Sequence, residues 1–161
     1  TYGSINIGGD AGSNGGNLLL DNGPKADGTI TEEEIKSVKT LGEWNKKNGE
    51  AIFNTLPGIP QGHFYGPTTL SADSTTLYLF VHGKTSGDLM LKGLDNKIEN
   101  ITVLGSGTNL KDKIVGKISW SPVPGLVYIS LPEAILDKYV TVLKVKLDKP
   151  IKLYRGQGWL N

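Results

Sequence analysis

The feature that most constrains the fold is a series of short β-forming segments in the chain from about residue 56 onward. These segments are rich in β-branched, aromatic and leucine residues, and clusters of Gly, Pro, Asp and Asn separate them. Short strands divided by turn signals are typical of an antiparallel β-sandwich. We therefore predict such a sandwich, with strands over residues 76–82, 88–92, 98–104, 117–120, 126–129 and 139–147.

Two of these segments carry further information on burial. In the segment 139–147, Lys144 and Lys146 lie between or beside valine and leucine positions, which predicts one solvated face. In the segment 117–120, Trp120 is expected to be a core residue. The Pro- and Gly-rich stretch 57–62 precedes the strands, and we interpret it as a linker.

A different pattern occupies residues 17–48. The apolar run 17–20 ends in the turn sequence Asp-Asn-Gly-Pro, which favours a strand buried on both faces of a parallel sheet. Thr31 and Glu34 then have the spacing of a capping box at a helix N-terminus. Apolar residues follow at helical spacing up to Trp44, and Gly49 is expected to end the helix. Strand, turn and amphipathic helix together predict one βα unit.

The first sixteen residues are unusual because glycines are concentrated there, at positions 3, 8, 9, 12, 15 and 16. Residues 1–16 have no sustained period and little apolar surface, so we expect a flexible lead-in. The predicted organisation is a Gly-rich lead-in over 1–16, a βα unit over 17–55 and a β-sandwich over 56–161. Because the chain starts at Thr1 without an initiator Met, we expect that it follows a processing boundary or is part of a longer protein.

Composition excludes several classes of function. The formal net charge of the 161 residues is +1, which argues against a dedicated nucleic-acid binder. The chain has no cysteine, which removes disulfides, thiolate metal sites and cysteine nucleophiles. No apolar run approaches the roughly 18 residues that a membrane-spanning helix needs. We expect no nucleic-acid partner and no membrane-spanning segment.

Metal and cofactor motifs are weak. Residues 25–34 resemble half of a calcium-binding loop, but Gly23 and Lys25 occupy positions that require oxygen ligands. His63 and His82 are isolated by their spacing, which favours structural roles. We therefore predict no metal site and no cofactor. Among the three tryptophans, Trp159 near the C-terminus is the freest to meet a ligand, because Trp44 and Trp120 are expected in the core.

Two stretches of the sequence point to a known family. Residues 16–30, GNLLLDNGPKADGTI, resemble the GNLLLNxGPxxDGxI stretch of family 29 α-L-fucosidases, and residues 41–55, LGEWNKKNGEAIFNT, resemble the IGEWLxxNGEAIYxT stretch. Both occur in the expected order and separation. Further pieces at 63–68, 76–81, 91–94 and 150–155 are similar to the C-terminal domain of bacterial members. The resemblance extends over residues 16–155.

This resemblance implies a mainly β fold with a short α/β segment. Residues 17–55 would be one terminal βα unit of a (β/α)8-like catalytic barrel, and the antiparallel β-sandwich would follow it. The parent enzyme would release terminal α-L-fucose from fucosylated glycans with retention of configuration, in the periplasm or outside the cell. The family's catalytic Asp nucleophile and acid/base residue lie on earlier barrel segments, so we assign no catalytic residue here. The family also has an amphipathic helix before the GNLLL stretch, where this chain has its Gly-rich residues.

Asp21 and Asn22 follow the predicted strand and depart from the family's Asn-aliphatic pair. In a barrel this end of a strand faces the active site, so these two residues are the ones that we nominate for substrate binding, although the turn sequence favours the alternative that they only build the turn before Pro24. A second hypothesis for the whole chain is a carbohydrate-binding module that presents Trp159, Tyr65 or His63 to sugars. A third is a structural piece that pairs with a companion chain carrying the rest of the barrel.

Overall fold

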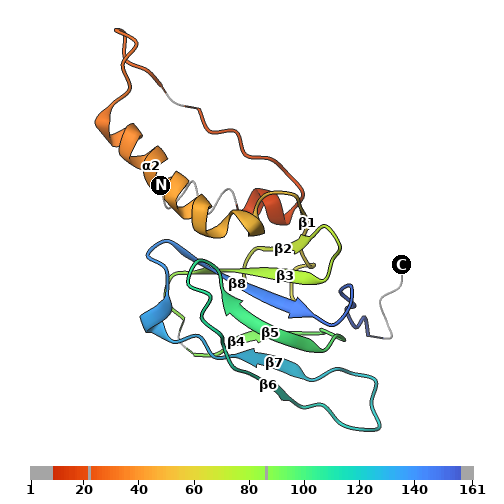
Figure 1. Cartoon of the computed structure of the whole chain (residues 1–161). Coiled ribbons are helices and arrows are strands. Elements are labelled where there is room, and N and C mark those ends of the chain that lie inside the picture. Colours follow the sequence, from red (N-terminus) through yellow and green to blue (C-terminus); the bar gives the residue numbers. More distant parts are fainter. Residues whose placement is uncertain (1–8, 22, 86, 157–161) are drawn as a thin grey trace.

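The computed structural model describes residues 9–21, 23–85 and 87–156, and its main elements are two antiparallel sheets and one long helix (Figure 1). The larger sheet has the strand order β1-β2-β3-β8-β5 and the smaller sheet the order β4-β7-β6. The larger sheet consists of β1 (Thr55–Pro57), β2 (Thr68–Ser71), β3 (Thr76–His82), β8 (Val140–Leu147) and β5 (Ile98–Val103). The smaller sheet consists of β4 (Leu89–Leu91), β7 (Leu126–Ile129) and β6 (Asp112–Val115). The predicted antiparallel sandwich is confirmed.

The main core lies between the two sheets. Alternate residues of β3 enter it, namely Leu77, Leu79 and Val81, and residues of β4, β5, β7 and β8 complete it. Because side chains of a strand alternate between its faces, Tyr78 and Phe80 point to the opposite side of β3. Strand β3 is therefore buried on both faces.

Helix α2 (Glu32–Asn48) covers the outer face of β3 and β8, with the 3-10 turn η1 (Gly49–Ala51) at its end (Figure 1). Trp44 is 4% exposed, and its Nε1 donates a hydrogen bond of 2.9 Å to the carbonyl oxygen of Val140. Tyr78, Phe80, Val140 and Val142 complete this second core. The predicted core position of Trp44 is confirmed, and the second core explains why the first half of β8 has no solvated face.

The start of α2 is formed as its sequence predicts. The hydroxyl of Thr31 accepts a hydrogen bond from the backbone N–H of Glu34 at 3.2 Å, and the backbone N–H of Thr31 donates to the Glu34 carboxylate at 3.1 Å. Two of the free N–H groups at the helix N-terminus are thus satisfied by local contacts. This helix start needs no tertiary partner.

The predicted strand over residues 17–20 is not formed. This stretch runs away from the sheets beside α2 (Figure 1), and Leu18, Leu19 and Leu20 are 37%, 92% and 45% exposed. A parallel strand needs neighbouring strands to satisfy its backbone groups, and none of the strands in the described part of the chain lies next to it. The apolar pattern is typical of a strand, but no strand in the described residues pairs with this stretch.

The expected flexible lead-in also differs from the structure, although residues 1–8 lie outside the described residues. Residues 9–13 are helical and lie against the larger sheet. A Cβ on Gly9 would lie 3.4 Å from the Phe80 ring, and one on Gly12 would lie 3.6 Å from Thr69. A Cβ at either position would make ordinary van der Waals contact with the sheet, which shows that this short helix packs on it. A helix therefore precedes the GNLLL stretch after all.

The strand predicted over residues 117–120 is not formed either. The strand is β6, and residues 116–125 form the long connection to β7. Pro122 and Pro124 have no backbone N–H to donate to a partner strand, so the pairing ends at Val115 and Leu126. Trp120 is consequently 83% exposed and does not belong to the core.

The stretch interpreted as a linker contains the end of strand β1 and leads into β2. Gly58 passes so close to β2 that a Cβ at this position would lie 1.9 Å from the carbonyl oxygen of Thr68. The hydroxyl of Thr68 accepts a hydrogen bond of 2.9 Å from the backbone N–H of Ile59. Pro57 and Gly58 therefore serve a close strand contact at the sheet edge.

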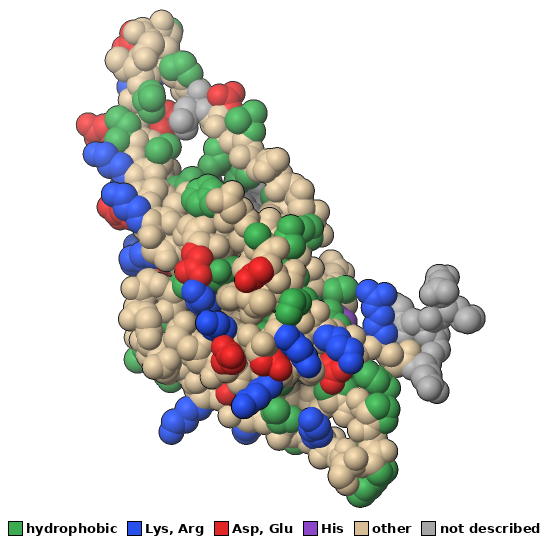
Figure 2. Space-filling model, turned by 45° about the vertical axis from the view of Figure 1, so that its right-hand side comes forward, with side chains coloured by type: hydrophobic (Ala, Val, Ile, Leu, Met, Phe, Trp, Pro, Cys, Tyr) green, Lys and Arg blue, Asp and Glu red, His purple; other side chains and the backbone are tan. Residues whose placement is uncertain are grey.

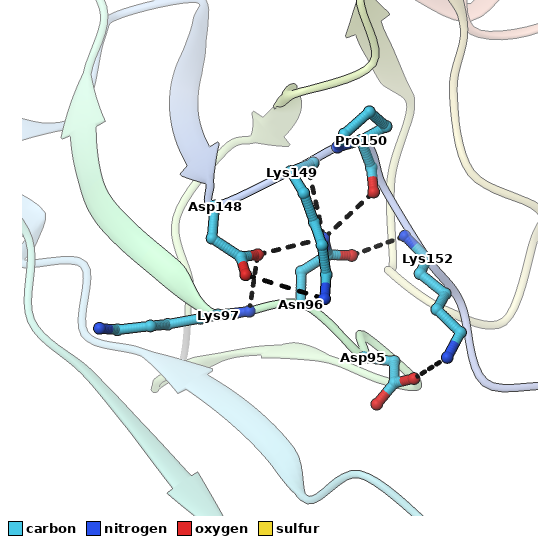
Figure 3. A network of polar contacts seen from close by, with 7 residues as sticks. All are labelled: Asp95, Asn96, Lys97, Asp148, Lys149, Pro150 and Lys152. Carbon is cyan, nitrogen blue, oxygen red and sulfur yellow. Dashed lines mark hydrogen bonds and ion pairs between the residues drawn. The ribbon is translucent and has the colours of Figure 1, made fainter.

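The segment after β8 is fixed by a polar network around Asn96 (Figure 3). The Asn96 amide nitrogen donates to Asp148 Oδ1 at 3.3 Å and to the carbonyl oxygens of Lys149 and Pro150, while its Oδ1 accepts from the backbone N–H of Lys152 at 2.6 Å. Lys152 also pairs with Asp95 at 2.8 Å. One side chain thus holds the chain between β4 and β5 against the segment 148–152.

The turn between β2 and β3 predicts a pH-dependent stability. Hydrogen bonds from Ser71 and Thr75 lower the pKa of Asp73 from 3.8 to about 2. A lowered pKa in the folded state stabilises the protein above pH 3.8, and this contribution is lost as the pH falls to about 2. We expect Asp73→Asn to lower the Tm at pH 5 and to leave a much smaller difference from wild type near pH 2. Thermal unfolding followed by circular dichroism from pH 5 to pH 2 measures this, and a Tm difference that does not shrink would contradict the prediction.

Candidate functional site

The first candidate site is an apolar surface formed by the segment 17–21 and the N-terminal half of α2. We call it the exposed leucine face and define it by Leu18, Leu19, Leu20, Ile35 and Val38. Ile35 and Val38 are 42% and 51% exposed although they continue the apolar stripe of α2. Figure 2 shows hydrophobic side chains along this projecting part of the molecule, with an opening between the segment and the helix.

The base of the exposed leucine face is a cavity of about 270 Å³ between the segment and α2. Its lining is mostly apolar and includes Leu18, Leu20, Leu41, Trp44, Ile52 and Phe53. Leu18 and Leu20 thus lie on one side of the cavity and the end of the helix on the other. The side chains here are apolar, as in a protein core, but they leave a cavity between them.

Of the three predicted binding residues, only Asp21 lies within the described residues. It is exposed and directly follows the leucines of the exposed leucine face. Asn22 and Trp159 lie outside the described residues. Substrate binding by Asp21, Asn22 and Trp159 therefore remains a prediction.

The second candidate site is a pair of clefts on either side of the loop 58–67, which we call the loop clefts. One has a volume of about 640 Å³ and extends toward residues 84–92; the other has a volume of about 890 Å³ and extends toward residues 10–14. Both are lined by Gly62, Phe64, Tyr65, Gly66 and His82. The loop forms a ridge between them, and Tyr65 on this ridge is 100% exposed.

The two histidines lie at the loop clefts in different states of contact. His63 Nδ1 lies 2.8 Å from the carbonyl oxygen of Lys92, and the backbone N–H of Lys92 donates to the carbonyl oxygen of His63 at 2.8 Å. As donor in the first contact, Nδ1 carries the proton and leaves Nε2 of the neutral ring as an acceptor. Burial lowers the pKa of His82, and the nearby Asp10 partly opposes this shift. His82 is therefore neutral at pH 7.

Two of the charged side chains that line the loop clefts form ion pairs. Lys84 lies 3.4 Å from Glu133, and Asp88 lies 3.0 Å from Lys113. In the described residues, no group of three or more His, Asp or Glu side chains is placed to hold a metal ion. Lys92 and Asp10 also line the clefts and form no ion pair among the described residues, so the loop clefts offer both charged and neutral polar groups beside an aromatic ring.

The sequence pattern does not reveal the loop clefts, because the Pro- and Gly-rich stretch 57–62 is typical of a linker and the pattern does not predict β2. The one sequence feature that points to this loop is an aromatic residue, Tyr65, between two glycines, Gly62 and Gly66. A residue such as Gly66, which has φ +141° and lies close to the backbone of Phe80, indicates a tightly fitted loop. That approach is visible only in the folded chain.

Comparison with known proteins identifies the relatives of this chain. Residues 10–50 match the family model for alpha-L-fucosidase. Human plasma alpha-L-fucosidase is 36% identical over 81 residues, which are 48% of this chain and 17% of that protein. Human tissue alpha-L-fucosidase is 32% identical over 123 residues, 74% of this chain and 25% of that protein.

A solved structure of alpha-L-fucosidase from Vibrio sp. strain EJY3 has the same fold, with a TM-score of 0.80 over 93% of this chain and 26% of that one. The sequence identity is 22%, so this likeness shows the fold alone. None of the helices described in the structure is long and apolar enough to span a membrane. This chain spans a quarter or less of the human relatives' length. It is related over most of its length to the α-L-fucosidases of glycoside hydrolase family 29, and matches only part of such a protein.

Proposed function

We propose that the chain is the C-terminal part of an α-L-fucosidase-like glycoside hydrolase. In this proposal residues 17–55 are the terminal βα unit of the catalytic barrel, and residues 56–161 are the sandwich that packs beside it. The parent enzyme hydrolyses terminal α-L-fucose from fucosylated glycans with retention, in the periplasm or outside the cell. The similarity to several α-L-fucosidases supports the assignment.

The observation that carries this proposal is the exposed leucine face. Full burial of a leucine side chain stabilises a fold by about 1.5–3 kcal/mol relative to exposure. Three adjacent exposed leucines therefore add little to the stability of this chain, and a partner surface that buried them would gain this stabilisation. Strands of a parallel barrel are apolar on both faces because helices and the barrel interior cover them. Neighbouring barrel strands and helices would bury residues 18–20, fill the cavity of about 270 Å³ and cover Ile35 and Val38.

The reaction chemistry is consistent with catalytic groups elsewhere in the parent protein. Retaining glycosidases need two carboxyl groups about 5–5.5 Å apart, one as nucleophile and one as acid/base. A barrel has about 250 residues, so residues 17–55 amount to one of its eight units. We place both carboxylates on preceding segments, and we place Asp21 and Asn22 near the substrate, because active sites of such barrels lie at the C-terminal ends of the strands.

A longer protein that contains these residues tests the proposal directly. We expect it to release the aryl group from an aryl α-L-fucoside, whereas the 161-residue chain gives no release above a boiled control. Turnover by the 161-residue chain alone would overturn the proposal.

A pair of substitutions tests the role of the exposed leucine face. In the longer protein, Leu19→Asp should lower fucosidase activity by tenfold or more, because it places a charge in the barrel wall. Ile114→Asp is the matched control, since Ile114 is 55% exposed on β6, and it should leave activity unchanged. Equal activity of the two variants would show that residue 19 is not buried in the parent enzyme.

A further inference from the structure

We propose that the loop clefts form a binding site for a neutral saccharide, with Tyr65 as the aromatic surface on which a sugar ring stacks. The proposal does not rest on the proposed function, because it concerns only residues of the sandwich and the short helix 9–13. It has three parts: the position of Tyr65, the hydrogen-bonding groups beside it, and the balance of charge around it.

The backbone on both sides of Tyr65 is anchored by its neighbours. Phe64, the residue before it, is 8% exposed and packs in the core between the sheets. On the other side, the carbonyl oxygen of Pro67 accepts a hydrogen bond of 3.0 Å from the backbone N–H of Phe80, and a Cβ on Gly66 would lie 2.7 Å from the carbonyl oxygen of Phe80. The loop is thus anchored on both sides of Tyr65, while the Tyr65 ring itself stays fully exposed.

An exposed aromatic ring on an anchored backbone beside a cleft is suited to the apolar face of a sugar ring. The C–H groups of a pyranose pack on the π-face, while its hydroxyl groups need donors and acceptors at the edge. Since Tyr65 lies on the ridge between the loop clefts, a saccharide stacked there reaches polar groups on both sides. The combined volume is large enough for more than one sugar ring.

The polar groups beside Tyr65 match hydroxyl groups. In the neutral tautomer that donates Nδ1–H to the carbonyl oxygen of Lys92, His63 Nε2 is an acceptor. His82, neutral by burial, offers one donor and one acceptor to a ligand that reaches either cleft. On the other side the cleft is lined by Ser13, at the end of the short helix, and by Asn14, which follows it. Both side chains donate to the carbonyl oxygen of Asp10, so their oxygens remain available as acceptors.

Charge around the loop clefts favours a neutral ligand over an anionic one. The pairs Lys84–Glu133 and Asp88–Lys113 neutralise charges at the edge of the cleft that extends toward residues 84–92. Lys92 lines the same cleft without an ion pair among the described residues, and Asp10 borders the other cleft, so the charges that line the two clefts balance one another. A neutral polyol needs no excess of charge of either sign in its binding site.

Ligand-observed NMR on the 161-residue chain tests the proposal, with 2′-fucosyllactose and lactose as the two probes. We expect saturation transfer to at least one probe, and about tenfold weaker binding by Tyr65→Ala, because the stacking surface is lost. Tyr65→Phe keeps the ring and should bind as the wild type does. Trp120→Ala removes an equally solitary exposed aromatic from the β6–β7 connection and should also bind normally.

Two results would overturn the proposal: no saturation transfer to either probe at millimolar concentration, or binding that Tyr65→Ala leaves unchanged. Binding of lactose but not of 2′-fucosyllactose would support the saccharide site and count against a role in fucose recognition. Fucosidase activity of the longer protein is measured separately, so failure of one proposal is distinguishable from failure of the other.

Discussion

Trp44→Ala is expected to lower the free energy of unfolding by about 3–5 kcal/mol, the range for removal of a buried aromatic side chain. Trp44 is the largest side chain between α2 and the larger sheet, and its loss leaves a cavity against Tyr78 and Phe80. The substitution also leaves the carbonyl oxygen of Val140 without the hydrogen bond from the indole.

The effect on α2 should be larger than the effect on the sandwich. Ile35 and Val38 are exposed, so the N-terminal half of the helix has little apolar contact to keep it in place. We expect hydrogen exchange of α2 amides to accelerate strongly in Trp44→Ala, while amides of β3 and β8 keep more of their protection. Trp120→Ala is the matched control and should change the free energy of unfolding by less than about 0.5 kcal/mol. Equal destabilisation by the two substitutions would contradict the assigned cores.

Leu79→Ala is expected to lower the free energy of unfolding by about 2–5 kcal/mol. Leu79 is fully buried at the centre of β3, where it is paired with Leu143 of β8, and it faces the core between the sheets. Because the residues of both sheets meet at this position, the loss should be global. Circular dichroism of the sheets and fluorescence of Trp44 should therefore report one common transition at lower urea concentration.

Leu56→Ala provides the comparison for this substitution. Leu56 lies on edge strand β1 and is 41% exposed, so the same chemical change should cost less than about 1 kcal/mol. Urea denaturation of both variants measures the difference. If the two substitutions destabilise the chain equally, Leu79 is not in the main core.

Local patterns were sufficient for a large part of this fold. The capping box of Thr31 and Glu34 and the strands β3, β4, β5, β7 and β8 could all be predicted, because each depends on residues close together in the sequence. The stretch 117–120 shows the limit of that reasoning. Its alternation is typical of a strand, but the prolines that follow prevent pairing, and Trp120 is exposed for that reason.

The site was less predictable than the fold. Tyr65 and His63 could be named from the sequence as candidates for sugar contact, but the sequence does not show that Tyr65 lies on a ridge between two clefts. That position depends on the close approach of Gly66 to β3 and on the burial of Phe64 in the core between the sheets. Both contacts join residues whose spacing in the sequence carries no signal.

By itself, the sequence determined the start of α2, the β-rich character of residues 56–161 and the relationship to α-L-fucosidases. Only the tertiary structure decided which apolar residues are buried. Leu79 and Leu19 are equally apolar and both lie in stretches typical of strands, yet one is fully buried and the other is 92% exposed. The physical reason is that a strand is buried only when another strand or helix lies against it, and β3 has such neighbours on both faces whereas residues 17–20 have none among the described strands.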